Sequence, residues 1–336
     1  MEAICIPKMY CPFPPQISPY AQEVHEHSLA WATRFQMIQG EAARRRFHGT
    51  NLARLTARAY PTASLEDMKL LNDWMVWFFV FDDQFDDVLG TSLESALSTV
   101  HAYIKICEDA GEQSAPGPAA AALCDLYRRT LPRMSPDWRT RFTRHFIQYL
   151  DTYTWMGQHH LQGAIPELHV YLEYRYHSGG AVPSLDLIEF ADRLCLPDEL
   201  LLNWEFERLN RAANHAICWS NDIFSLAKEL ARGEVSNLVV ITKHMYRLSW
   251  QEAIESVNTM VTNEVRLFER IERQMPPVAP HLAADAYRYI AGLKAWIRAN
   301  FDWSAETHRY LHVEQTRAGE TVSYVEPILA TAPMIE

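Results

Sequence analysis

From Glu23 onward, the pattern of apolar and polar positions along the chain is that of α-helices. Alternation with period two, which would indicate half-buried strands, is hard to find, and glycine is scarce, with 12 residues in the whole chain. The predicted helices cover roughly residues 22–38, 39–47, 66–90, 93–110, 119–131, 136–158, 166–177, 185–193, 197–231, 236–245, 249–273 and 280–309. We therefore predict an all-α fold.

The segments between the predicted helices contain residues that usually begin or end helices. Residues 109–118 form a polar stretch rich in Gly and Pro, and Gly179-Gly180 followed by Pro183 ends a helix. Neither an internal repeat nor a linker long enough to separate two domains is visible. We therefore predict one α-helical bundle domain over residues 1–336.

The two ends of the chain differ from this helical pattern. Residues 1–20 contain five prolines, which fix the backbone and remove hydrogen-bond donors, so we expect an extended strap over the surface. The C-terminal residues 311–336 are less regular, and we expect a flap or a disordered tail there.

Composition and charge exclude several classes of partner. The formal net charge of −11 argues against nucleic acid and anionic membranes. The longest unbroken apolar run, Trp74–Phe81, has eight residues and is too short for a membrane span. The six cysteines form no CxxC pair and match no zinc-ligand spacing. We interpret them as free, mostly buried thiols of a cytoplasmic protein.

Four carboxylates within the predicted helix over residues 66–90 follow directly on its apolar run, Trp74–Phe81. Asp82 and Asp86 are four residues apart and share a helix face, with Asp83 and Asp87 beside them. Carboxylates so close together repel one another unless a cation lies between them, and Mg²⁺ prefers such oxygen ligands. The alternative is a solvated acidic helix end, but that would not require the aromatic residues just upstream.

A second polar stripe lies on the predicted helix over residues 197–231. Asn221, Ser225 and Glu229 are spaced at i, i+4 and i+8, which turns them by only about 80° around the helix. An amide oxygen, a hydroxyl and a carboxylate can chelate one hard cation, and the neighbouring Lys228 can reach a phosphate. The alternative for this stripe is an ordinary polar helix face.

Together, the two stretches resemble the class I terpene synthase family, which combines an aspartate-rich motif with an Asn/Ser/Glu motif. The resemblance covers nearly the whole chain and is to the microbial single-domain type. It implies a helical bundle with a central active-site cavity, and Mg²⁺-dependent ionisation and cyclisation of a prenyl diphosphate. Farnesyl diphosphate is the substrate that the resemblance favours. Three Mg²⁺ ions are implied, two at Asp82 with Asp86 or Asp87, and one at the Asn/Ser/Glu stripe.

The resemblance also assigns a sensor for the diphosphate on a helix that breaks. Arg175 matches the sensor position, Ser178 the linker and Gly179 the effector. The linker is often Asp or Thr in the family, and Gly180 adds a second glycine here. The family pattern further implies that Asp83 pairs with Arg175 once substrate closes the site.

Two further features concern the diphosphate and the hydrocarbon chain. The Arg309-Tyr310 pair matches a family position that binds diphosphate together with Arg175 and Lys228. Aromatic faces stabilise carbocations without reacting with them. The candidate pocket aromatics are Phe78, Phe79, Trp296 and Trp303.

Three other interpretations stay open at this point. A chain-elongating prenyltransferase would carry two aspartate-rich motifs, whereas the second motif here is Asn/Ser/Glu. A diterpene synthase acting on geranylgeranyl diphosphate would share every motif described above. A non-catalytic helical scaffold would not need metal ligands and cations at five separate places to agree. The sequence fixes neither the product nor the oligomeric state, for which a homodimer is one option.

Overall fold

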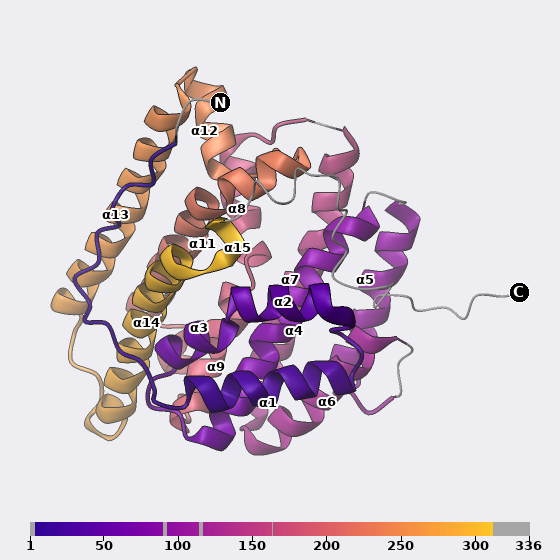
Figure 1. The fold of residues 1–336 in the computed structure, drawn as a ribbon. Coiled ribbons are helices and arrows are strands. Elements are labelled where there is room, and N and C mark those ends of the chain that lie inside the picture. Colours follow the sequence, from indigo (N-terminus) through magenta and orange to yellow (C-terminus); the bar gives the residue numbers. More distant parts are fainter. Residues whose placement is uncertain (1–3, 90–92, 114–116, 163, 312–336) are drawn as a thin grey trace, which may run out of the picture.

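The computed structural model describes residues 4–89, 93–113, 117–162 and 164–311, and these residues form α-helices, one 3₁₀ turn and no strand (Figure 1). The all-α prediction is therefore confirmed. The elements in chain order are α1 (Ala21–Arg34), α2 (Gly40–Thr50), α3 (Leu52–Ala59), α4 (Leu65–Leu89), α5 (Leu93–Glu108), α6 (Pro118–Thr130), η1 (Leu131–Arg133), α7 (Pro136–Gln162), α8 (Leu168–Ser178), α9 (Ala181–Asp192), α10 (Asp198–Leu201), α11 (Trp204–Arg232), α12 (Leu238–Tyr246), α13 (Trp250–Gln274), α14 (Pro280–Glu306) and α15 (His308–Leu311).

Single residues break several helices that the sequence pattern predicts as continuous or places differently. Asn51 adopts a left-handed conformation between α2 and α3, and α3 was not predicted. Thr307 is extended and separates α14 from α15, which the pattern joins into one helix. Asn203 caps α11 by accepting a hydrogen bond from the backbone N–H of Glu205, so α10 and α11 are separate helices.

The helix break after α8 lies at the two glycines, as predicted. Gly180 has a positive φ of 64°, which favours glycine, and α9 starts at the next residue. This start is four residues earlier than predicted, because Pro183 lies in the first turn of α9, where a missing N–H removes no helical hydrogen bond.

An aromatic core surrounds α4. In Figure 1, α13 and α14 lie on one side of α4, and α5 and α7 lie on the other. The fully buried ring of Phe146 on α7 has its centroid 5.5 Å from Trp74, 5.4 Å from Trp77 and 5.5 Å from Phe78. These edge and tilted ring contacts fix the register of α4 against α7 and so orient the carboxylates at the end of α4.

The N-terminal segment runs along α13 and α14 without regular secondary structure (Figure 1). The backbone N–H of Cys5 donates to Gln251 Oε1 at 3.0 Å. Phe13 is buried against Phe268, with ring centroids 5.6 Å apart. The predicted flap or tail over residues 312–336 lies outside the described residues.

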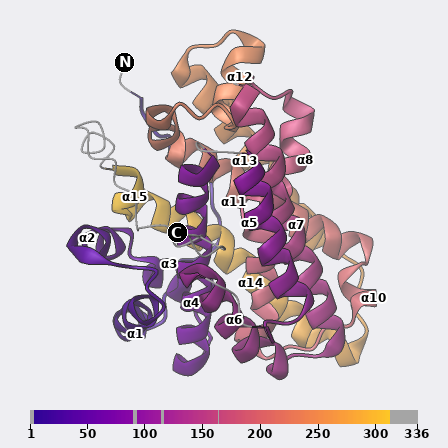
Figure 2. The ribbon, with the colours of Figure 1, turned by 90° about the vertical axis from the view of Figure 1, so that its right-hand side faces the viewer.

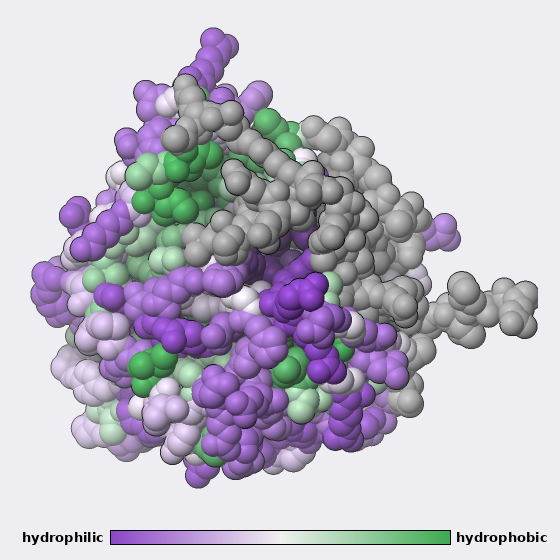
Figure 3. All heavy atoms as spheres, viewed as in Figure 1, coloured by the Kyte–Doolittle hydropathy of each residue, from purple (hydrophilic) through white to green (hydrophobic). Residues whose placement is uncertain are grey.

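The molecular surface is mainly polar over α1 and α2 on the face seen in Figure 3. Among the described helices, none is long and apolar enough to cross a membrane. A second view, turned by 90°, shows α1 and α2 projecting beside α3 and α4 (Figure 2). None of the six cysteines forms a disulfide; Cys107, Cys124 and Cys218 are buried, whereas Cys5 and Cys195 are exposed.

The aromatic core predicts a large effect of one substitution. Phe146→Ala removes a ring with several aromatic neighbours, so we expect the free energy of unfolding to fall by about 3–5 kcal/mol. Urea denaturation followed by circular dichroism measures it. The matched control is Tyr287→Ala on the exposed side of α14, where we expect a change within about 0.5 kcal/mol. Equal effects of the two substitutions would contradict the assignment of Phe146 to the core.

Candidate functional site

The buried carboxylate of Asp83 joins the end of α4 to two cations from other helices. Arg309 on α15 donates from Nη1 to Oδ2 at 2.6 Å and from Nη2 to Oδ1 at 2.8 Å. Lys228 on α11 donates from Nζ to Oδ1 at 3.1 Å. Burial alone would raise the pKa of Asp83, but the charges of Arg309 and Lys228 outweigh burial and hold this pKa well below its usual range. Three residues that the sequence singled out therefore form one ion-pair cluster.

Asp82 lies beside this cluster and is more exposed. Its Oδ2 is 3.5 Å from Arg309 Nη2, and its Oδ1 accepts a hydrogen bond of 3.1 Å from the hydroxyl of Tyr153. Asp86 and Asp87 lie on the backbone of α4, but their side chains are outside the described part of the structure. Their predicted role as ligands stays a prediction.

The Asn/Ser/Glu stripe on α11 faces the same region. Asn221 donates from Nδ2 to the hydroxyl of Tyr310 at 2.8 Å, and Tyr310 directly follows Arg309 in the sequence. Ser225 donates to the backbone oxygen of Asn221 at 2.8 Å, and Glu229 Oε2 accepts from Asn237 Nδ2 at 2.8 Å. The stripe and the aspartates of α4 are thus linked through the Arg309-Tyr310 pair on α15.

Arg175 on α8 lies against α11 rather than against α4. Its Nε donates to Asp222 Oδ1 and its Nη2 donates to Asn221 Oδ1, both at 2.8 Å. The structure therefore brings the predicted sensor onto the predicted metal stripe. The pairing of Arg175 with Asp83, expected with substrate, stays a prediction.

Asp222 and Tyr171 are residues of this region that the sequence analysis did not single out. Asp222 is buried and accepts hydrogen bonds from Arg175, from the Tyr171 hydroxyl at 2.8 Å and from the backbone N–H of Leu238 at 3.1 Å. Burial raises the pKa of Asp222, although Arg175 opposes the shift. A signal for Tyr171 was available, because it precedes Arg175 by four residues and so shares its helix face.

The four candidate pocket aromatics lie in three different environments. Phe79 packs edge-to-face on Trp303, with centroids 5.4 Å apart, and the guanidinium of Arg309 lies 5.0 Å above the Phe79 ring. Phe78 instead points toward the aromatic core and Gly180. Trp296 packs on Tyr60, with centroids 5.4 Å apart. Phe79 and Trp303 are therefore the two that adjoin the ion-pair cluster.

The chemistry of the donor set fits a hard divalent cation. Asp82, Asn221, Ser225 and Glu229 offer carboxylate, amide and hydroxyl oxygens, which suit Mg²⁺ completed by water and phosphate oxygens. Among the described residues, no cluster of three or more His, Cys, Asp or Glu side chains could hold a metal by itself. The donor set is thus a mixed one, from two helices, in which Asn221 Oδ1 also accepts from Arg175.

A further buried carboxyl group, that of Glu234, lies close enough to Glu229 for the charge of Glu229 to affect it. Burial, followed by the charge of Glu229, raises the pKa of Glu234 to about 8, although Lys228 and Arg232 oppose this shift. Acidic groups that disfavour one another's ionisation in this way are stabilised by a cation.

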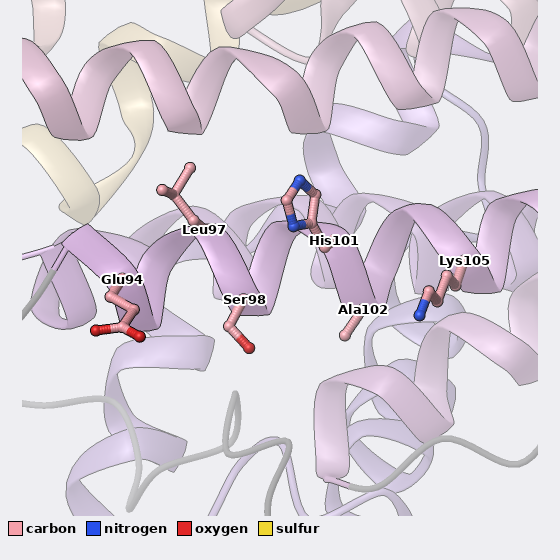
Figure 4. A pocket seen from close by; sticks show the side chains of 6 residues that line it. All are labelled: Glu94, Leu97, Ser98, His101, Ala102 and Lys105. Carbon is pink, nitrogen blue, oxygen red and sulfur yellow. The ribbon is translucent and has the colours of Figure 1, made fainter.

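A separate hollow of about 530 Å³ lies along α5 (Figure 4). Its lining residues are Glu94, Leu97, Ser98, His101, Ala102 and Lys105. None of them belongs to the ion-pair cluster or to the stripe on α11.

Comparison with known proteins agrees with this arrangement. Residues 73–267 match the family model described as terpene synthase family 2, C-terminal metal binding. A germacrene A synthase of Nostoc punctiforme is 33% identical over 95% of this chain and 99% of its own length. A (+)-T-muurolol synthase of Roseiflexus castenholzii, named as cyclising (2E,6E)-farnesyl diphosphate, is 32% identical over 90% of this chain and 93% of its own.

Solved structures show the same fold. The crystal structure of germacradien-4-ol synthase from Streptomyces citricolor superposes with a TM-score of 0.80, at 24% identity, over 90% of this chain and 99% of that one. With the match to the family model and relatives above 30% identity over almost the full length, the chain belongs to the terpene synthase family, the family that its two oxygen-rich helical stretches resemble.

Proposed function

We propose that this protein is a class I terpene synthase that ionises and cyclises farnesyl diphosphate to a cyclic sesquiterpene and releases diphosphate. The observation that carries the proposal is the meeting of Asp83 on α4, Lys228 on α11 and Arg309 on α15 beside the oxygen stripe of α11. The substrate follows from the relatives, one of which is named for cyclising farnesyl diphosphate.

The residues of this site divide into metal ligands and diphosphate ligands. Asp82, with Asp86 or Asp87, and the stripe of Asn221, Ser225 and Glu229 would hold Mg²⁺, three ions in all. When bound, the metal supplies positive charge to the departing diphosphate. The diphosphate itself would be held by Lys228, Arg309, Tyr310 and Arg175 through charge-assisted hydrogen bonds.

Phe79 and Trp303 are proposed to form the wall next to the diphosphate. A carbocation formed there meets ring faces, which stabilise positive charge and offer no nucleophile. The same rings exclude water, which would otherwise quench the cation early. We further propose that the protein acts in the cytoplasm, where its thiols stay reduced. For the oligomeric state, we propose a homodimer.

Replacing two residues of the Asn/Ser/Glu stripe tests the proposed function directly. In the double variant Asn221→Ala with Glu229→Ala, we expect Mg²⁺-dependent conversion of farnesyl diphosphate to be abolished while far-UV helicity stays intact, because two of the three oxygen ligands are lost. Analysis of volatile products measures it, with C10 and C20 diphosphates tested in parallel.

A matched control makes the same two changes elsewhere. Asn263→Ala with Glu255→Ala alters exposed residues of α13 that are also eight positions apart. We expect this variant to retain full turnover. Undiminished product from the α11 double variant would refute the proposed function, and consumption of isopentenyl diphosphate would favour a prenyltransferase.

The proposed effector Gly179 lies where the chain has no room for a side chain. A Cβ there would lie 2.6 Å from Cys218 Sγ and 3.0 Å from Arg175 Nη1. Overpacking of this kind costs about 1–3 kcal/mol or displaces the neighbour. One of the two neighbours, Arg175, is the proposed sensor.

For Gly179→Ala we therefore expect turnover to fall about tenfold or more, which corresponds to about 1.4 kcal/mol. Steady-state kinetics measures it. Combining it with Cys218→Ala removes the closer contact and should recover part of the loss, whereas Cys218→Ala alone serves as the control. Wild-type turnover of Gly179→Ala would contradict the role of this glycine.

A further inference from the structure

Asn237 is a fully buried polar residue between α11 and α12, eight positions after Glu229. It is the N-cap of α12 and follows the turn that ends α11 at Gly233, whose φ is 78°. The side chain of Asn237 reaches both Glu229 and the backbone of Asp222, so Asn237 lies on the side of α11 that carries Glu229.

The side chain of Asn237 uses its full capacity for hydrogen bonds. Nδ2 donates to Glu229 Oε2 and to the backbone oxygen of Asp222, both at 2.8 Å. Oδ1 accepts from the backbone N–H of Val239 at 2.8 Å and of Val240 at 3.4 Å. Because an amide offers two donor hydrogens and two acceptor lone pairs, its orientation is fixed by all four contacts together.

These contacts fix a carboxylate that would otherwise be mobile. Glu229 lies in the last turn of α11, and a glutamate side chain loses considerable rotamer freedom when it is held in one position. A neutral donor holds one oxygen without cancelling the negative charge, in contrast to the arginine and lysine that pair with Asp83.

We propose that Asn237 is a positioning residue for metal binding: it holds the carboxylate of Glu229 in the orientation that Mg²⁺ requires. This inference rests on the proposed function, in which Glu229 is a metal ligand. Groups that orient metal ligands affect metal affinity by about 10–100-fold when they are replaced. The competing explanation is that Asn237 serves only as the helix cap of α12 and as a buried link to Asp222.

The test separates these two roles with a substitution that keeps the cap. Asn237→Ser retains an acceptor suited to an N-cap, but serine is too short to reach Glu229 Oε2. Asn237→Asp retains the size and the capping acceptor, and its ionised carboxylate replaces the donor to Glu229 by a negative charge that repels it. The control, Asn203→Ser, makes the first change at the N-cap of α11, where Asn203 Oδ1 accepts from the backbone N–H of Glu205 at 2.9 Å.

The readout is thermal stability in the presence of inorganic pyrophosphate, measured as the Mg²⁺ concentration is raised. The compared quantity is the Mg²⁺ concentration that gives half of the maximal rise in Tm, a binding measurement that needs no turnover. We expect this concentration to rise about 10–100-fold in both Asn237 variants and to stay within about twofold of wild type in Asn203→Ser. The KM for farnesyl diphosphate and the kcat, measured at saturating Mg²⁺, should recover toward wild type.

Two results would overturn the proposal, and they are distinguishable. If Glu229→Gln shifts the Mg²⁺ requirement but neither Asn237 variant does, Asn237 is only a cap and the proposed function stands. If Glu229→Gln itself leaves the requirement unchanged, the metal role of Glu229 fails, and the role of Asn237 fails with it.

Discussion

The buried ion pairs of Asp83 are the interaction on which the rest of this site depends. A carboxylate buried without a partner is strongly destabilising, so the end of α4 can be buried only where cations meet it. Arg309 and Lys228 supply them from α15 and α11. Once α15 is held there, Tyr310 lies within hydrogen-bond distance of Asn221, and the two oxygen-rich stretches face a common region.

The ion pairs of this site also explain how an acidic protein can bind an anion such as diphosphate. The chain has a net charge of −11, yet each of the three cations proposed for the diphosphate already pairs with a carboxylate: Arg309 and Lys228 with Asp83, and Arg175 with Asp222. Their side chains are therefore ordered before any substrate arrives. Binding then exchanges one anionic partner for another and does not have to immobilise flexible side chains, which lowers its entropic cost.

Local spacing predicted the parts of the site that lie on one helix. Asn221, Ser225 and Glu229 follow from helical periodicity, and the all-α fold follows from the same pattern. The break at Thr307, which turns the Arg309-Tyr310 pair toward α4, could not be predicted in this way, because the preceding residues continue the helical pattern.

Contacts between residues on different helices also could not be predicted from spacing along the sequence. Asn237 and Asp222 act through partners on other elements, and a polar residue after a helix has many possible neighbours in a sequence alone. Trp296 lies seven residues before Trp303 on α14 and so shares its helix face, but it packs on Tyr60, because a helix as long as α14 crosses several environments along one face.

The N-terminal segment has a consequence for the order of assembly. The backbone N–H of Cys5 donates to Gln251, and the backbone oxygen of Phe13 accepts from Arg298, so this segment contacts helices that lie 246 and 285 residues later in the chain. Loop closure over such separations is slow and entropically costly. During translation, this segment therefore has no native partners until α13 and α14 have been synthesised.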